Sequence, residues 1–144
     1  MAKRILVVED NEANQMVTGE IIRLAGYRFD VVGTGAAAVE AVKTRPYGLI
    51  LMDCQMPEMD GYEATAAIRK AGSEERGAQN DISRIPIIAM TANAMKGDRE
   101  KCLDAGMDDY ISKPVNATKL KEAIDKWGQK ITVVDDENQK ELSQ

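Results

Sequence analysis

Five short, nearly continuous runs of apolar residues constrain the fold of this chain more than any other feature. They occupy residues 5–8, 29–32, 49–52, 85–90 and 110–111 and are rich in valine, isoleucine and leucine. Strands of this composition are typical of a sheet that is covered on both faces. None of the runs approaches the roughly 18 residues that a membrane-spanning helix requires. We therefore expect the runs to form the buried strands of a parallel sheet.

Helical patterns fill the segments between the runs. The first helix is predicted over about residues 11–24, with Val17, Ile21 and Leu24 on one face and Gly26 as its stop signal. A strand followed by a helix and another strand, repeated along the chain, predicts right-handed crossovers that place helices on both sides of the sheet.

Caps and stop signals delimit the other four predicted helices. Thr34 is a candidate N-cap for the second helix, which ends before Pro46, and Gly61 precedes the third. The fourth helix is predicted over about residues 98–105, and the polar segment 72–84 predicts a loop before the fourth strand. The last helix follows the cap Asn116, and its core-facing stripe consists of Leu120, Ala123, Ile124 and Trp127.

The chain length and the polar end of the sequence predict the domain organisation. A chain of 144 residues is long enough for one domain with a buried core. We expect that domain to occupy residues 1–128 and residues 129–144 to form a polar C-terminal tail. The expected fold class is α/β, with a doubly wound five-stranded parallel sheet.

Polar side chains follow four of the five predicted strands. Glu9 and Asp10 come after the first strand, Asp53 after the third, Thr91 after the fourth and Lys113 after the fifth. An acid after a strand is by itself usually a helix cap or a solvated loop residue. Ligands of open parallel sheets, however, bind outside the carboxyl ends of the strands, so these five side chains are expected to share one site.

The composition of this group predicts phosphoryl chemistry with a metal ion. Three converging carboxylates repel one another unless a cation lies between them, and a hard cation such as Mg²⁺ prefers oxygen ligands. A carboxylate beside Mg²⁺ can attack a phosphoryl group and become an acyl phosphate. Lys113 can neutralise the phosphoryl charge and Thr91 can donate a hydroxyl, although Lys113 can also act only as the ion-pair partner of an acid.

Composition excludes several classes of function. The chain has no histidine, which excludes Ser-His-Asp triads, histidine zinc sites and histidine general bases. Its net charge of −5 disfavours binding to nucleic acid or to an anionic membrane surface. Cys54 and Cys102 are too few for a disulfide framework and fit free, buried thiols in the cytoplasm. The early acids Glu9 and Asp10 argue against a signal peptide.

Four segments together resemble the receiver domain of two-component response regulators. They are residues 5–11 (ILVVEDN), 51–61 (LMDCQMPEMDG), 86–92 (PIIAMTA) and 105–114 (AGMDDYISKP), and the resemblance covers about residues 3–127. Residues 52–57 and 91–95 are most similar to receivers of hybrid sensor histidine kinases. The resemblance implies a flavodoxin-like sheet with strand order 2-1-3-4-5.

The resemblance also implies roles for individual residues. Asp53 is expected to accept the phosphoryl group, with Lys113 contacting that group and a cis peptide bond between Lys113 and Pro114. Mg²⁺ is expected to bind Asp10, Asp53 and the backbone carbonyl of Gln55, with Glu9 acting on the ion directly or through water. Thr91 and Tyr110 are expected to be the switch residues that respond to phosphorylation. Met56, Pro57 and Gly61 are expected to shape the loop after Asp53, and Gln55 and Asn93 to tune dephosphorylation.

The expected activity is signalling rather than turnover of an external substrate. Receivers take the phosphoryl group from a phosphohistidine, and a chain without histidine needs a donor elsewhere, on a sensor histidine kinase or a histidine phosphotransfer protein. Phosphorylation is then expected to change the affinity of the face formed by the fourth helix, fifth strand and fifth helix for an unknown protein partner. We expect either a stand-alone receiver or one that belongs to a larger kinase, in the cytoplasm, with no nucleic acid or membrane partner.

Four other interpretations remain open on the sequence alone. Residues 33–38 (GTGAAA) match the G-x-G-x-x-A pattern of nicotinamide-cofactor domains, but that interpretation leaves Glu9, Asp10, Thr91 and Lys113 without roles. A flavodoxin-like electron carrier would share the fold class, although one Trp, four Tyr and one Phe provide few rings to hold a flavin. The others are a Mg²⁺ phosphatase that acts on external phosphoesters and a receiver that is never phosphorylated.

Overall fold

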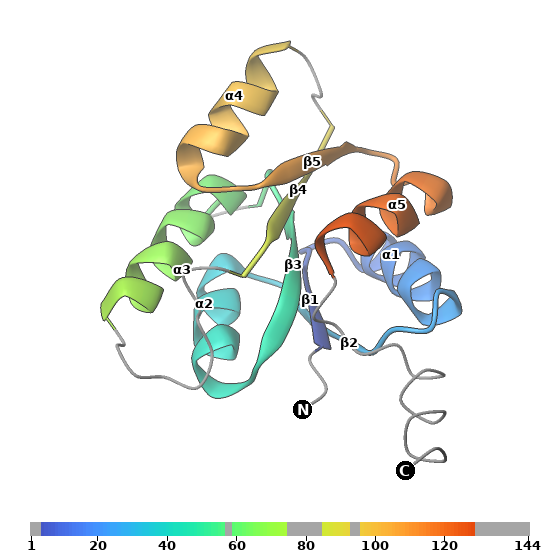
Figure 1. The fold of residues 1–144 in the computed structure, drawn as a ribbon, viewed down its shortest axis with the longest axis horizontal. Coiled ribbons are helices and arrows are strands. Elements are labelled where there is room, and N and C mark those ends of the chain that lie inside the picture. The colour runs from blue at the N-terminus through green and yellow to red at the C-terminus, as the bar shows by residue number, and fades with distance from the viewer. Residues whose placement is uncertain (1–3, 57–58, 75–84, 93–95, 129–144) are drawn as a thin grey trace.

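The computed structural model describes residues 4–56, 59–74, 85–92 and 96–128 of the chain. Within these residues the five strands form one parallel sheet in the order β2-β1-β3-β4-β5, which confirms the expected topology (Figure 1). The strands are β1 (Arg4–Val8), β2 (Phe29–Val32), β3 (Tyr47–Asp53), β4 (Ile87–Thr91) and β5 (Asp109–Ser112). The predicted tail over 129–144 lies outside the described residues.

Only β2 begins where the apolar runs predict; β1 and β5 each begin one residue earlier, and β3 and β4 are each displaced by two residues. β3 starts at Tyr47 because Tyr47 pairs with Arg4 across an irregularity in the ladder between β1 and β3. β4 starts at Ile87 rather than at residue 85. Pro86 has no N–H to donate, although its carbonyl still accepts a hydrogen bond of 2.9 Å from the N–H of Ile50.

Five helices connect and flank the strands. They are α1 (Glu12–Leu24), α2 (Gly35–Thr44), α3 (Gly61–Glu74), α4 (Lys96–Ala105) and α5 (Ala117–Trp127). The side chains of Asn11, Thr34 and Asn116 accept hydrogen bonds from the first turns of α1, α2 and α5, which confirms the two predicted N-caps, Thr34 and Asn116, and adds Asn11 as a third. No helix in the described part of the chain is long and apolar enough to cross a membrane.

The expected loop over 72–84 was placed too early along the chain. Helix α3 continues to Glu74, so residues 72–74 are helical, and residues 75–84 lie outside the described ranges. The polar composition of 72–74 does not prevent helix formation, because the preceding turns of α3 are already in place and extending a helix requires no new nucleus.

The predicted apolar face of α1 is confirmed for Ile21, which packs partly buried against the core, and is wrong for its other two residues. Val17 and Leu24 are 51% and 72% exposed, and the residues of α1 that are buried are Thr18, Gly19 and Ile22. A Cβ atom at position 19 would lie 2.8 Å from the ring of Phe29, so the absence of a side chain on Gly19 allows this ring to pack against the helix. The helix therefore packs on Ile22, on the partly buried Ile21 and on two small residues, Thr18 and Gly19.

The sheet divides the core into two layers because side chains alternate along each strand. Leu6 and Val8 face the layer that contains residues of α2, α3 and α4, whereas Ile5 and Val7 face the layer that contains residues of α1 and α5. Figure 1 shows α1 and α5 together on one side of the sheet and α2 and α3 on the other. Trp127 is partly buried and packs against the α1 and α5 layer, as the stripe on the last helix predicts.

Candidate functional site

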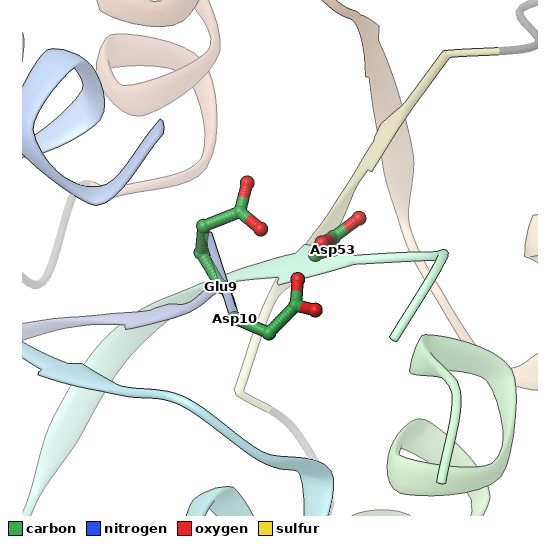
Figure 2. Close-up of side chains that lie close together, drawn as sticks. All are labelled: Glu9, Asp10 and Asp53. Carbon is green, nitrogen blue, oxygen red and sulfur yellow. The ribbon is translucent and has the colours of Figure 1, made fainter. Parts of the chain in front are cut away.

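The three predicted acids meet at the carboxyl ends of two neighbouring strands. Asp53 is the last residue of β3, and Glu9 and Asp10 follow β1, which pairs with β3 so that Val8 lies opposite Met52. One carboxylate oxygen from each of the three acids lies within 4.8 Å of the others. Figure 2 shows the three side chains reaching the same region at the end of β3. The structure therefore brings together residues that are 43 positions or more apart, counted from Asp10 to Asp53.

The carboxylate of Asp53 is almost completely buried and is held on one oxygen. Its Oδ1 atom accepts hydrogen bonds from Lys113 Nζ at 2.8 Å and from the backbone N–H of Gln55 at 3.0 Å. Its Oδ2 atom is buried and has no hydrogen-bond partner among the described residues when both acids are ionised. The side chain is only 1% exposed, so its orientation is fixed by these contacts.

Glu9 is as deeply buried as Asp53 and lies against the same lysine. Its Oε1 atom is 3.1 Å from Lys113 Nζ, and its side chain is 1% exposed. Burial raises the pKa of Glu9 to about 7, and the neighbouring Asp53 contributes because a proton on Glu9 provides a hydrogen bond to that carboxylate. The site therefore resists holding two negative charges unless further positive charge is supplied.

The charges of Asp53 and Lys113 stabilise each other despite burial. Burial by itself raises the pKa of Asp53, but hydrogen bonds from Glu9, Lys113 and the Gln55 N–H outweigh it and hold the pKa below its ordinary value. Burial likewise lowers the pKa of Lys113, yet the carboxylates of Asp53 and Glu9 raise it above its ordinary value. An ionised aspartate and a charged lysine thus face each other at the end of β3.

This donor set is the kind that a hard divalent cation uses. Three carboxylates within reach of one ion, two of them with a buried oxygen that has no hydrogen-bond partner among the described residues, match the oxygen ligands that Mg²⁺ takes in proteins. Gln55 joins the site through its backbone N–H. The metal-binding role expected for the Gln55 carbonyl remains a prediction.

Thr91 and Lys113 lie side by side, Thr91 at the end of β4 and Lys113 directly after β5. Thr91 is fully buried at the end of β4, and its carbonyl accepts a hydrogen bond of 2.8 Å from the N–H of Lys113. The peptide bond between Lys113 and Pro114 is cis, as predicted. Four of the five predicted strand ends therefore contribute to the same edge of the sheet, in the order of the strands.

Tyr110 is half-buried on β5 and lies between two cavities. A cavity of about 380 Å³ is lined by Tyr110, Lys119 and Lys126, and a second of about 260 Å³ is lined by Tyr110, Cys102 and Trp127. The ring therefore has open space on the face that β5 shares with α4 and α5. Asn93 and Pro57, which the sequence analysis singles out, lie outside the described residues.

Two features of the site were not predicted from the sequence: the contact made by Gln15, and the reason why residue 61 is a glycine. Gln15 on α1 donates a hydrogen bond of 2.6 Å to the backbone carbonyl of Glu9. At Gly61 a Cβ atom would lie 2.3 Å from the carbonyl oxygen of Asp53, so glycine is required where α3 begins against the end of β3. The position of Gln15, one turn after the cap Asn11, is a sequence signal that could have indicated its contact.

The G-x-G-x-x-A segment has a packing role in this fold. Thr34 caps α2 by accepting a hydrogen bond of 3.0 Å from the N–H of Ala37. A Cβ atom at Gly35 would lie 2.9 Å from the sulfur atom of Met59, so the glycine allows this close contact. These contacts account for the motif without a bound nucleotide.

Comparison with known proteins gives a consistent result. The response regulator receiver domain family matches residues 5–125. Hybrid signal transduction histidine kinase B of Dictyostelium discoideum is 46% identical over 121 residues, which cover 82% of this chain and 6% of that kinase. The chain thus spans only a small fraction of the length of the curated relatives that it matches.

Two solved structures combine sequence and fold similarity. The first is the receiver domain of a Pseudomonas aeruginosa sensor histidine kinase with a magnesium ion coordinated in its active site cleft. It has a TM-score of 0.74 at 45% identity, covering 88% of this chain and 98% of that one. The second is the receiver domain of a Saccharomyces cerevisiae response regulator in complex with a histidine phosphotransfer protein. It has a TM-score of 0.79 at 33% identity, covering 88% and 89% of the two chains.

Proposed function

Because the chain belongs to the response regulator receiver domain family, we propose that it accepts a phosphoryl group on Asp53 within a two-component phosphorelay. This assignment is supported most directly by the hydrogen bonding and burial of the two Asp53 carboxylate oxygens. One oxygen is fixed by Lys113 and the Gln55 N–H, while the other is buried beside Glu9 and Asp10 without a hydrogen-bond partner in the described structure. That second oxygen is the natural nucleophile.

Glu9, Asp10 and Asp53 are proposed to hold Mg²⁺, together with the carbonyl of Gln55. The raised pKa of Glu9 supports this proposal, since two buried carboxylates in contact with a single lysine leave unbalanced negative charge. The bound ion supplies positive charge for the phosphoryl oxygens during transfer. The related Pseudomonas aeruginosa receiver holds a magnesium ion in its active site cleft.

The transfer step itself needs little from the protein beyond orientation and charge. An oxygen of Asp53 forms a bond to phosphorus while the bond from phosphorus to the donor histidine nitrogen breaks, and that nitrogen keeps the electron pair. Lys113 lies 2.8 Å from Asp53 Oδ1 and stabilises charge on the transferred group. Later attack of water on the phosphorus regenerates Asp53 and releases inorganic phosphate.

Thr91 and Tyr110 are proposed to transmit the phosphorylated state to the surface. Thr91 lies at the end of β4, and its strand pairs with β5 so that Ala89 is opposite Tyr110. A hydroxyl contact between Thr91 and the phosphoryl group would shift this strand end, and Tyr110 has cavities on the same face into which its ring can move. The outcome is a change in the affinity of the α4, β5 and α5 face for a protein partner.

The functional unit is proposed to be residues 1–128, with 129–144 as a polar tail. The proposed donor is a phosphohistidine on a sensor histidine kinase or a histidine phosphotransfer protein, which the complex of the related Saccharomyces cerevisiae receiver supports. The buried, free thiols of Cys54 and Cys102 support an expected location in the reducing cytoplasm. In this proposal the chain is phosphorylated and dephosphorylated at its own Asp53 and does not turn over an external phosphoester.

Intact mass spectrometry after incubation with Mg²⁺ and acetyl phosphate tests this function. We expect a single phosphoryl adduct on the wild type that is lost when Mg²⁺ is chelated and is absent from Asp53→Asn. Asp104→Asn, which removes an exposed acid on α4, is the matched control and should be phosphorylated normally. An adduct that persists in Asp53→Asn, or no adduct with either acetyl phosphate or a phosphohistidine donor, would refute the proposal.

A further inference from the structure

The backbone carbonyl of Glu9 has an unusual partner for its position. β1 ends at Val8, and the N–H of Glu9 still donates a hydrogen bond of 3.0 Å to the carbonyl of Val32 on β2. The carbonyl of Glu9, by contrast, accepts its 2.6 Å hydrogen bond from the side-chain amide of Gln15. At Glu9, where the acid pair begins, a side chain from α1 therefore donates the hydrogen bond that a neighbouring strand would donate within the sheet.

The geometry of α1 directs Gln15 to that carbonyl. Asn11 caps the helix, and the N–H of Gln15 closes the first turn by donating 2.9 Å to the carbonyl of Asn11. Side chains on a helix point toward its N-terminus, so a residue one turn in reaches back over the preceding loop. The N–H of Asn11 is also 3.3 Å from the Glu9 carboxylate. The loop from Glu9 to Asn11 is therefore held by its backbone and by a side chain.

The contact acts on Asp10 through the rigidity of the peptide group. The carbonyl oxygen of Glu9 lies in the same plane as the N–H and Cα of Asp10, because the peptide bond does not rotate freely. Fixing that oxygen from Gln15 therefore fixes the peptide plane that carries the Asp10 Cα, and the contact of the Asn11 N–H with the Glu9 carboxylate holds the next peptide plane. The two contacts together restrict the direction in which the Asp10 side chain leaves the backbone. Asp10 is exposed, unlike Glu9 and Asp53, and burial does not hold its carboxylate in the cluster.

We propose that Gln15 is a positioning residue that sets the orientation of Asp10 for divalent cation binding. The proposal rests on the proposed function only in assigning Mg²⁺ to the acid cluster. Gln15 does not contact the phosphoryl group in this scheme and is not a catalytic residue. Its effect is on how tightly the cation binds and not on how fast Asp53 reacts once the cation is bound.

The test compares Gln15→Met with the wild type and with Asn14→Ala. Methionine keeps the length of the side chain and removes the hydrogen-bond donor, and Asn14 is an exposed neighbour on the same turn of α1. Mg²⁺ affinity is measured by calorimetry, and phosphorylation by acetyl phosphate is followed across a Mg²⁺ titration. We expect Gln15→Met to weaken Mg²⁺ binding by about tenfold, as loss of a residue that supports a metal ligand does elsewhere.

At saturating Mg²⁺ we expect the phosphorylation rate of Gln15→Met to be within about twofold of the wild type. Asn14→Ala should match the wild type in both measurements. The melting temperature, recorded with and without Mg²⁺, separates positioning from general stability. A positioning role makes the Mg²⁺-induced rise in melting temperature smaller in Gln15→Met, whereas a purely structural role lowers both temperatures equally. Gln15→Ala is a second variant without a donor if the methionine variant does not fold.

Unchanged Mg²⁺ affinity in a folded variant without the donor would overturn the proposal, and so would an equal loss of stability with and without Mg²⁺. A lower rate at saturating Mg²⁺ with normal affinity would also overturn it, since Gln15 would then act on the chemistry. A wild type that binds no Mg²⁺ and accepts no phosphoryl group would instead refute the proposed function, so the two failures are distinguishable.

Discussion

Three charged side chains, Glu9, Asp53 and Lys113, are buried together where most proteins of this size would place apolar residues. Isolated burial of a single such charge is strongly unfavourable, and a pair compensates for it only with good hydrogen-bond geometry. Here one lysine serves two acids, and the compensation is incomplete. Burial and the neighbouring Asp53 raise the pKa of Glu9 to about 7. An additional cation in the cluster would therefore stabilise the ionised form of both acids.

A second polar cluster, in which only Tyr47 is buried, lies at the other end of the sheet and gives a prediction for alkaline pH. The hydroxyl of Tyr47 donates 2.8 Å to Asp30, which also accepts hydrogen bonds from Arg4 and Arg45. Burial raises the pKa of Tyr47 to about 12 from 10.0, and the charge of Asp30 adds to the shift. The folded state thus holds this proton more tightly than the unfolded state does, and the resulting stability is complete below pH 10.0 and is lost as the pH approaches 12.

We expect the free energy of unfolding of Tyr47→Phe to be about 2 kcal/mol lower than that of the wild type at pH 8. This difference in stability should become smaller as the pH rises from about 10 to 12. Urea denaturation at a series of pH values measures the difference. Tyr27→Phe is the control, because the Tyr27 hydroxyl contacts Asp125 at an exposed position, and its difference from the wild type should change little with pH. A constant difference between Tyr47→Phe and the wild type would contradict the expectation.

At the scale of elements, the start of α3 gives a sharp contrast between two glycines. A Cβ atom at Gly61 would overlap the carbonyl of Asp53 at 2.3 Å, whereas one at Gly33 would meet nothing within 4 Å. Gly61→Ala should therefore destabilise the protein by about 1–3 kcal/mol, because α3 must move away from β3. Gly33→Ala, the matched control, should change the stability by no more than about 0.5 kcal/mol.

The same shift of α3 should displace Asp53, since the overlap is with its own carbonyl. Phosphorylation of Gly61→Ala by acetyl phosphate should be slower than that of the wild type under conditions in which both are folded. Chemical denaturation and intact mass spectrometry measure the two effects. Equal stability of the two alanine variants would show that α3 does not need glycine at this point.

The elements differ in how well the sequence predicts them, and the reason is physical. Strands and caps follow from local signals: apolar runs mark buried strands, and Asn11, Thr34 and Asn116 cap helices through bonds within one turn. The burial of Gly19 on α1 depends on its tertiary contact with Phe29, which the spacing of apolar residues along the helix does not indicate. The candidate site was predictable because parallel strand ends must share one edge, whereas the contact between Gln15 and the Glu9 carbonyl depends on how α1 sits on β1.

At the scale of the whole molecule, α1 presents apolar side chains beside the acid site. Met16 and Val17 are 75% and 51% exposed, and they lie within two turns of the cap Asn11, which follows Asp10 directly. A phosphohistidine domain must bring its imidazole to Asp53 and therefore rests its surface on this edge. We expect Met16 and Val17 to contact the proposed protein donor.

Replacement of Met16 and Val17 by serine should slow phosphoryl transfer from a phosphorylated histidine phosphotransfer domain by about tenfold, the loss expected for two contact residues at an interface. Transfer from acetyl phosphate, which needs no docking surface, should remain unchanged. Leu103→Ser, at an exposed apolar position on α4, is the matched control for solubility and stability. Equal slowing with both donors would place the effect in the acid site instead of in docking.

Asp53 terminates β3, whose seven residues are all buried and which pairs on one side with β1 and on the other with β4. The proposed phosphoryl acceptor is thus attached to a fully buried central strand, whereas β5 lies at the edge of the sheet (Figure 1). Substitutions of exposed residues on the outer helices, away from Thr91 and Tyr110, should be transmitted only weakly to the Asp53 carboxylate. The outer surface that an output partner would contact can therefore vary in sequence while the packing that holds Asp53 in place is kept.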